Sequence, residues 1–327
     1  MVLSLYVPCD RGTMQPPVHL GKLTLGMTDP AAINQHMLAS YSVAPASTAE
    51  ITDTNTFFRF DGTRWSNLGY ITGNVYTAAD INGHGDLVTC LGTETAKTWN
   101  YKNCVFDLRG TPLDQQDEMF SVVQGAHASL ENCVFLGGKK AILCGSGDSG
   151  DWGGSLTMKN CVVIGCGRRM PEAQQGYTVT MNGCWLHNWG IEETFDVRTF
   201  AVWVHDSATA DVTGCVFTRN TGLGGNSDKD IAEWIGWYTN EFGALQALGK
   251  ERYGVSGSLR AIERIGGGSF TASNNYRNQS DFVAGGDTCW SMNAEGARAQ
   301  IEVLNRVCPD MAPYLGKSLL QYWIDAF

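Results

Sequence analysis

The stretches Tyr101-Lys-Asn-Cys-Val-Phe106 and Leu130-Glu-Asn-Cys-Val-Phe135 decide the fold, because they are the first two copies of a repeat. Three further copies follow: Met158-Lys-Asn-Cys-Val-Val163, Met181-Asn-Gly-Cys-Trp-Leu186 and Val212-Thr-Gly-Cys-Val-Phe217. The cysteines of these copies recur every 23 to 31 residues, and a sixth copy carries Asn275 in place of the cysteine. A period in this range is typical of a solenoid or a similar array.

The residues before each cysteine alternate between polar and apolar side chains, as in Ser155-Leu-Thr-Met158 and Tyr177-Thr-Val-Thr-Met181. This alternation indicates short strands and disfavours helical solenoids and leucine-rich repeats. The sequence therefore predicts an all-β parallel β-helix, in which equivalent residues of successive turns stack at about 4.8 Å.

The repeated Asn-Cys pair has a structural interpretation. We expect Asn103, Asn132 and Asn160 to form a ladder at a turn of the coil, with the cysteines in an inward column. Cysteine is among the most buried residue types, and none of the 11 cysteines has the C-x-x-C spacing of a zinc or redox motif. These thiols are therefore expected to be reduced core residues rather than metal ligands.

Three parts of the chain are predicted around this repeat. Residues 1–70 form an N-terminal region whose Asp61-Gly62 predicts a hairpin turn, and residues 71–290 form the β-helix. Within the coil, residues 228–252 have a helical pattern, and residues 291–327 form a helical C-terminal region with apolar residues on one face. Open ends of a β-helix expose unpaired strand edges, so a cap is expected at each end. Attachment or oligomerisation is the alternative role of both terminal regions.

Composition excludes several classes of protein. The chain has 327 residues, 43% of them hydrophobic, which argues against disorder. A formal net charge of −10 disfavours a general nucleic-acid binder, since phosphate binding needs an attractive field. No run approaches the roughly 18 apolar residues of a membrane span. The segment Met1 to Arg11 is a poor signal peptide, so synthesis in a cytoplasm without secretory export is expected.

Residues 118–220 resemble the pectate lyase superfamily, in particular polysaccharide lyase family one. Two segments carry most of the resemblance: Gly138-Lys-Lys-Ala-Ile-Leu-Cys-Gly-Ser-Gly-Asp-Ser149 and Gly167-Arg-Arg-Met-Pro-Glu-Ala-Gln-Gln-Gly176. The first is similar to the family's basic pair with its apolar strand, and the second is similar to its Arg-x-Pro segment. The run from Met181 to Trp189 is similar to the strand that follows in the family. The resemblance implies a right-handed β-helix and cleavage of an acidic polysaccharide by β-elimination.

The resemblance also implies roles for individual residues. Arg169 takes the place of the catalytic base, and Lys140 takes that of the lysine that binds the substrate carboxylate. Glu118 lies near the position of an acidic calcium ligand of the family, so the resemblance implies a Ca²⁺ cofactor. Asp114 and Asp117 are the candidates for its remaining carboxylate ligands.

Two departures weaken the resemblance. Gln174 or Gln175 stands where the family has a second arginine, and Val122 stands where it has a second acidic ligand.

Basic residues support the site without reference to the family. Lys139, Lys140, Arg168 and Arg169 are four of only 23 cationic residues, and 29 residues, about one turn of the coil, separate Lys140 from Arg169. Cations on neighbouring turns raise the cost of charging one another and attract an anionic ligand. Lys139 and Arg168 are therefore candidate substrate-binding residues. The alternative is that each pair lies on a solvated face.

Aromatic residues cluster just downstream. Trp185, His187 and Trp189 alternate along one predicted strand, so they are expected to share an outer face, as are Trp203 and His205 one turn later. Such a face would bind sugar rings by stacking. The alternative is that some of these side chains fill the core. No carboxylate partner for either histidine is evident from spacing.

The segment Phe57-Phe-Arg-Phe-Asp-Gly-Thr-Arg-Trp65 resembles short modules of bacteriophage tail and fibre proteins. Together with the poor signal peptide, this favours a phage protein that is made in the host cytoplasm and leaves the cell by lysis. We therefore expect a virion-associated β-helix that forms a trimer, contacts other virion proteins, and binds and cleaves by elimination an acidic polysaccharide. The alternatives are a catalytically inactive structural or decorating β-helix and, less favoured, an ordinary bacterial pectate lyase.

Overall fold

The computed structural model describes residues 19–44, 47–54, 56–60, 62–67, 71–83, 85–92, 98–112, 115–146, 152–190, 200–220, 260–264, 267–279 and 287–327. The helical insertion predicted at residues 228–252 and the candidate ligand Asp114 lie outside these ranges. The chain divides into two compact units, Met1–Ile71 and Thr72–Phe327. In the described part, no helix is both long enough and apolar enough to cross a membrane.

The first unit is a small sheet with one helix. Its elements are β1 (His19–Leu23), α1 (Pro30–Ser40), β2 (Thr48–Ile51), β3 (Thr56–Phe60) and β4 (Trp65–Asn67). The strand order is β1-β2-β3-β4, with β1 and β2 parallel and the other pairs antiparallel. The antiparallel pairing of β3 with β4 confirms the predicted hairpin. Ile33 and Met37 of α1 pack against Ala49, Phe58 and Trp65 of the sheet, which forms a separate core.

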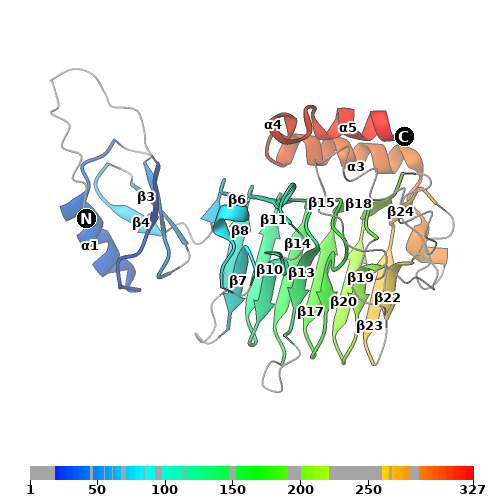
Figure 1. Ribbon diagram of the computed structural model, residues 1–327, viewed down its shortest axis with the longest axis horizontal. Helices are drawn as coiled ribbons and strands as arrows, with labels where there is room; N and C mark the ends of the chain where they lie inside the picture. Colours follow the sequence, from blue (N-terminus) through cyan, green and yellow to red (C-terminus); the bar gives the residue numbers. More distant parts are fainter. Residues whose placement is uncertain are drawn as a thin grey trace. The chain divides into compact units, whose positions relative to one another are not determined.

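The second unit is a right-handed parallel β-helix built from three sheets (Figure 1). Sheet I contains β5 (Ile71–Thr72), β8 (Thr98–Lys102), β11 (His127–Glu131), β14 (Ser155–Lys159), β17 (Thr178–Asn182), β20 (Thr209–Thr213) and β23 (Ser269–Ser273). Sheet II contains β6 (Val75–Thr77), β9 (Val105–Asp107), β12 (Val134–Leu136), β15 (Val162–Ile164), β18 (Trp185–His187), β21 (Val216–Thr218) and β24 (Tyr276–Arg277). Sheet III contains β7 (Val88–Leu91), β10 (Glu118–Val123), β13 (Lys140–Cys144), β16 (Glu172–Ala173), β19 (Phe200–Val204) and β22 (Arg260–Arg264). Short 3-10 helices lie at Ala78–Asp80 and Asp287–Trp290.

Each repeat of the sequence is one rung of this coil. The chain passes from sheet I to sheet II to sheet III, and every strand pairs in parallel with its counterpart one rung away. The predicted parallel β-helix is therefore confirmed.

The residue before each repeated cysteine makes the turn from sheet I to sheet II. It has a positive φ in every rung, between 51° and 66°, at Asn103, Asn132, Asn160, Gly183, Gly214 and Asn274. Only glycine and asparagine adopt this left-handed conformation readily, which explains why no other residue occupies the position. Asn132 Nδ2 donates to Asn103 Oδ1 at 3.1 Å, and Asn160 Nδ2 donates to Asn132 Oδ1 at 3.5 Å. The predicted asparagine ladder is confirmed.

The repeated cysteines form a buried column next to this ladder, as predicted. The solvent reaches none of Cys104, Cys133, Cys161, Cys184 and Cys215. Each thiol lies 3.4 to 3.6 Å from the carbonyl oxygen two residues earlier. Burial raises the pKa of the Cys161 and Cys215 thiols well above the ordinary value. These cysteines are therefore structural residues of the core.

Asn275 takes the place of the cysteine in the sixth rung and is also buried. Its Oδ1 accepts a hydrogen bond from Cys215 N at 2.8 Å, and its Nδ2 donates to Val212 O at 2.9 Å. The amide is tolerated in the core because both of its ends are hydrogen bonded.

The C-terminal region is helical, as predicted, with α3 (Ala294–Val307), α4 (Ala312–Leu315) and α5 (Leu319–Ala326). These helices lie along the outer side of sheet II (Figure 1), where Ile301, Leu304 and Trp323 pack against β15 and β18. The sequence predicts these helices over the open end of the coil. They cover its side instead, because the outward residues of sheet II are apolar over five rungs: Val105, Val134, Leu136, Val162, Ile164, Trp185 and Val216.

Candidate functional site

Charged side chains gather on sheet III, the sheet that carries Glu118, Lys140 and the segment around Arg169. Glu118 opens β10 and is the register partner of Lys140, which opens β13. The backbone of Lys140 in turn pairs with the backbone of Arg168 in the next rung, as an isolated parallel β-bridge. Stacking of rungs thus brings together residues that are far apart in sequence. The charged cluster comprises Asp86, Asp117, Glu118, Lys140, Arg169, Glu172, His205 and Asp206.

Glu118 is the centre of the cluster, and its side chain is only 4% exposed. Arg169 Nη1 donates a hydrogen bond to Glu118 Oε1, and Lys140 Nζ lies 3.4 Å from the same oxygen. Lys140 Nζ also donates to Asp117, whose side chain is 43% exposed. The two cations that the sequence analysis assigned to catalysis therefore converge on one buried carboxylate.

Asp86, which the sequence analysis did not identify, completes a group of three carboxylates. Oxygens of Asp86, Asp117 and Glu118 lie within 4.8 Å of one another. Asp86 is held in place because it accepts hydrogen bonds from Glu118 N at 3.1 Å and from Thr89 Oγ1 at 2.8 Å. The sequence offered one indication of this role, namely that Asp86 is an acidic residue just before a strand, one rung ahead of Glu118.

The three carboxylates differ in their tendency to ionise. Burial raises the pKa of Glu118 to about 7, and the charges of Asp117 and Asp86 add to this effect against the opposing charges of Arg169 and Lys140. Burial also raises the pKa of Asp86, although hydrogen bonds from Ser121 and Thr89 oppose it. Burial opposes ionisation of Asp117 as well, but the hydrogen bond and charge of Lys140 outweigh it and lower the pKa of Asp117. Separated pKa values among neighbouring carboxylates are typical of functional sites.

Glu172 extends the cluster to the next rungs on the other side of Arg169. Arg169 Nε lies 2.5 Å from Glu172 Oε2, as an ion pair whose N–H is not aligned for a hydrogen bond. Glu172 Oε1 lies 2.9 Å from His205 Nε2, and His205 Nδ1 lies 2.9 Å from Asp206 Oδ2. The Trp203 ring stacks on the His205 ring with centroids 4.4 Å apart. Glu172 and Asp206 are the carboxylate partners of His205 that spacing did not reveal.

The backbone at Arg169 is unusual for its residue type, with a φ of 60°. Arg169 O accepts a hydrogen bond from Ile142 N at 2.7 Å, which ties this left-handed residue to the neighbouring strand β13. A strained backbone at a charged residue is a feature of functional sites.

Lys139 and Arg168, the other predicted substrate-binding cations, flank the cluster. Lys139 N donates to Gln116 Oε1 at 2.8 Å, and Lys139 Nζ lies 3.5 Å from Gln116 O. Arg168 contributes backbone hydrogen bonds that join its rung to the previous one, accepting from Ala141 N and donating to Lys139 O. These contacts of Lys139 and Arg168 hold neighbouring rungs together at the charged cluster.

The expectation of an outward sugar-binding face at Trp185, His187 and Trp189 is wrong. All three side chains are fully buried: α5 covers the part of sheet II that carries Trp185 and His187, and Trp189 packs against Phe217. Trp185 Nε1 donates to Thr218 Oγ1 at 2.8 Å, and the Trp185 ring packs 5.6 Å from the ring of Trp323. These aromatic residues belong to the core.

His187 is held between two polar neighbours beneath the helices. Its Nδ1 lies 2.8 Å from Thr218 Oγ1, and its Nε2 lies 2.9 Å from Asn188 Nδ2. Burial lowers the pKa of His187 to about 3. Trp203 is buried as well, so of the five aromatic or histidine candidates only His205 lies in the charged cluster with part of its side chain exposed.

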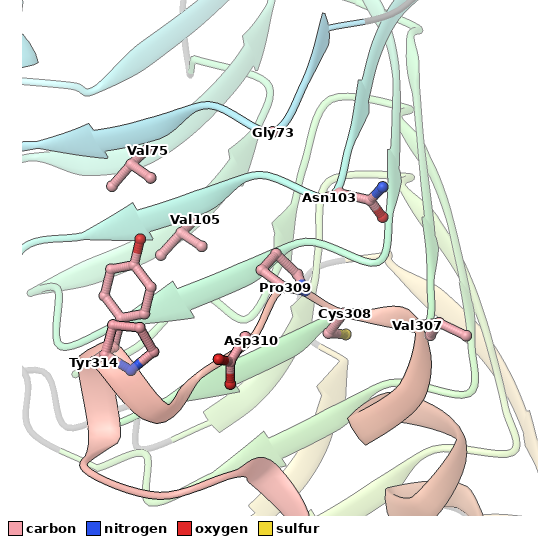
Figure 2. Close-up of a pocket in the computed structure, with 10 residues that line it drawn as sticks. Gly73, Val75, Asn103, Val105, Val307, Cys308, Pro309, Asp310 and Tyr314 are labelled. Atoms are coloured by element: carbon pink, nitrogen blue, oxygen red, sulfur yellow. The ribbon is translucent and has the colours of Figure 1, made fainter.

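A separate groove of about 380 Å³ lies between sheet II and the C-terminal helices. Figure 2 shows Val75 and Val105 on the strands opposite Pro309 and Tyr314 of the helical region. Its lining is mainly apolar and contains one carboxylate, Asp310. The groove therefore lacks the cations and the grouped carboxylates found on sheet III.

No protein-family model matches the chain, and no curated protein sequence matches it. The residues of the charged cluster therefore carry the functional argument. Lys140 and Arg169 can hold an anionic ligand, while the carboxylates around them can hold a cation or a proton.

The three carboxylates are the described residues that could contribute to the calcium site implied by the lyase resemblance. One oxygen each of Asp86, Asp117 and Glu118 lies within 4.8 Å of the others, which gives three of the six to eight oxygen ligands that calcium prefers. Val122, at the place of a further acidic ligand in the lyase family, is buried and supplies no oxygen. Glu118 and Asp117 are therefore joined by Asp86 as candidate ligands.

Proposed function

We propose that the protein is a virion-associated β-helix that binds an acidic polysaccharide at the charged cluster and cleaves it by β-elimination. The observation that carries the proposal is the convergence of Lys140 and Arg169, from consecutive rungs, on the buried carboxylate of Glu118. The fold by itself supports no particular activity, since one fold hosts many functions.

The chemistry needs a positive field and a proton acceptor. Elimination removes the proton next to the sugar carboxylate, forms a carbon–carbon double bond and expels the glycosidic oxygen. Lys140 and Arg169 would bind the carboxylate and stabilise the enolate charge that develops on it. A calcium ion held by Asp86, Asp117 and Glu118 would supply further positive charge at that place.

The role of base that the lyase resemblance implies for Arg169 depends on its neighbours. Arginine is normally charged and is therefore a poor proton acceptor, and the carboxylates of Glu118 and Glu172 lie against the guanidinium of Arg169. The pKa of about 7 at Glu118 means that a proton neutralises this carboxylate in part near neutral pH. Neutralisation of Glu118 would weaken one of the two ion pairs of Arg169 and leave more of its positive charge for the substrate carboxylate.

The second candidate is a structural or decorating β-helix without catalysis. Both cations of the cluster are already paired with carboxylates of the same chain, Lys140 with Asp117 and Arg169 with Glu118 and Glu172. An internal ion-pair network of this kind joins neighbouring rungs whether or not a substrate binds.

One experiment separates these candidates. The protein is incubated with polygalacturonate, alginate and host capsule, with and without calcium, while the ultraviolet absorbance of unsaturated uronides is followed. A lyase gives a signal that falls about 100-fold or more in Arg169→Ala, the size expected when a transition-state cation is removed. Arg298→Ala, which removes an exposed arginine paired with Glu302 on α3, is the matched control and should keep the activity. Absence of a signal on every acidic glycan, with binding to virions intact, supports the structural role.

The virion association and the oligomeric state are also proposals. They are supported by the similarity of the segment at residues 57–65 to phage tail modules. Light scattering should give a mass three times that of one chain if the protein forms the trimer expected of a phage spike. A monomer, together with absence from purified particles, would remove this part of the proposal.

A further inference from the structure

Glu172 is a buried carboxylate that the lyase resemblance does not assign. It follows the Arg169-Met-Pro segment and starts β16, in register with Leu143 on one side and Trp203 on the other. Its side chain is 3% exposed. A charge this deeply buried is costly unless it is paired, so its partners identify its role.

Each oxygen of Glu172 faces one basic group. Oε2 lies 2.5 Å from Arg169 Nε, and Oε1 lies 2.9 Å from His205 Nε2. Asp206 lies at the other nitrogen of His205, and the Trp203 ring covers one face of the imidazole. His205 is therefore fixed in position and in ring orientation, and it fixes Glu172 in turn.

We propose that Glu172, held by His205, is a positioning residue that sets the orientation of the Arg169 guanidinium. Glu118 contacts Nη1 of Arg169, and Glu172 contacts Nε. The contact at Nη1 is a hydrogen bond and the contact at Nε is an ion pair, and contacts at two different nitrogens restrict the rotation of the planar group more than one contact does. The backbone at Arg169 is already held, since Arg169 O accepts from Ile142 N at 2.7 Å and Met170 N donates to Ala201 O at 2.6 Å, so the orientation of the guanidinium depends on the contacts of the side chain.

This inference rests on the proposed function for its effect on activity. Glu172 itself is too buried to touch a polymer, so it acts through Arg169. Partners of this kind behind a reacting group are typically worth about 10-fold to 100-fold in activity. If the chain is a lyase, Glu172→Gln should lower kcat by about that factor and change KM little. Glu172→Asp, which keeps the charge on a shorter side chain, should recover part of the loss.

A second measurement tests the inference without any activity. In protein labelled with ¹⁵N-arginine, the Nε–H resonance of Arg169 is assigned by its disappearance in Arg169→Lys. Glu172→Gln should move this resonance and speed its exchange with water, and His205→Gln should do the same to a smaller extent. Glu131→Gln is the matched control, because Glu131 forms an exposed ion pair with Lys102 on sheet I.

The activity measurement and the resonance measurement can contradict the lyase function and the positioning role independently of one another. An Arg169 resonance that is unchanged in folded Glu172→Gln overturns the positioning role, whatever the activity. A resonance that depends on Glu172 in a protein that cleaves no acidic glycan keeps the positioning role and removes the lyase function. If Glu172→Gln does not fold, as judged by circular dichroism, Glu172→Asp and His205→Gln carry the same test.

Discussion

The outer faces of sheet II and sheet III belong to the same rungs and yet have opposite characters. Sheet II presents Trp185 and His187 outward, but the C-terminal helices cover them and turn this face into a core. Sheet III presents Glu172 and Lys140, and the charges there neutralise one another by ion pairs. The difference teaches that an outward position in a coil becomes a binding surface, a core or an ion-pair network according to what lies against it.

The largest effect is expected beneath the helices. Trp185→Ala should lower the free energy of unfolding by about 3–5 kcal/mol, because it leaves a cavity and removes the hydrogen-bond partner of Thr218. Trp152→Ala is the control, since that ring is 57% exposed, and it should change stability by less than about 0.5 kcal/mol. Urea unfolding followed by circular dichroism measures both. If both variants lost the same free energy of unfolding, the C-terminal helices would not be shielding Trp185 on sheet II from solvent.

His187 should make the helix-covered face sensitive to acid. Its pKa is lowered to about 3 in the folded state, against an ordinary value of 6.5, so the unfolded chain binds the extra proton between these values. Stability should therefore fall by about 2 kcal/mol as pH drops from 6.5 to 5. His187→Gln should abolish this loss. Hydrogen exchange of α5 against pH locates the effect, and an unchanged slope in the variant would contradict it.

Glu118 should make the protein more stable, rather than less stable, as pH falls. Its pKa is raised from 4.5 to about 7, so the folded protein binds the extra proton between these values. Stability should rise as pH falls through this window, by about 1 kcal/mol between pH 7 and pH 6. The His187→Gln variant isolates this gain, because the opposing histidine is absent, and Glu118→Gln should remove it. Melting temperatures of both variants across pH 5–8 provide the measurement.

A similarly small effect is expected at the corner between sheets I and II, which carries no charge and which Gln300 and Cys308 contact at Gly183 and Asn160. Asn132→Ala should cost about 1 kcal/mol, because alanine is strained at a φ of 55° and the ladder loses its hydrogen bonds to Asn103 and Asn160. Asn132→Gly, the residue type found at Gly183 and Gly214, should cost less. If the two substitutions cost the same, the ladder hydrogen bonds rather than the backbone conformation determine the residue at this corner.

The sequence predicted the parts of the candidate site that depend on the repeat. Lys140 and Arg169 were placed on adjacent rungs from their spacing of about one turn, and Glu118 was placed near them by the lyase resemblance. Asp86, Glu172 and Asp206 were missed, because rungs of unequal length shift which residues become neighbours. Register across strands, rather than spacing along the chain, brings these carboxylates to the two cations.

By itself, the amino-acid sequence determined the coil, its asparagine corner, its cysteine column and its terminal helices. Each of these depends on local backbone preference or on alternation between polar and apolar residues, which a single rung already contains. Only the tertiary structure decided which outer face is exposed and how the charges pair. Both depend on contacts between segments 20 to 150 residues apart, such as Cys308 on Asn160 and Arg169 on Glu118, and no local pattern records such contacts.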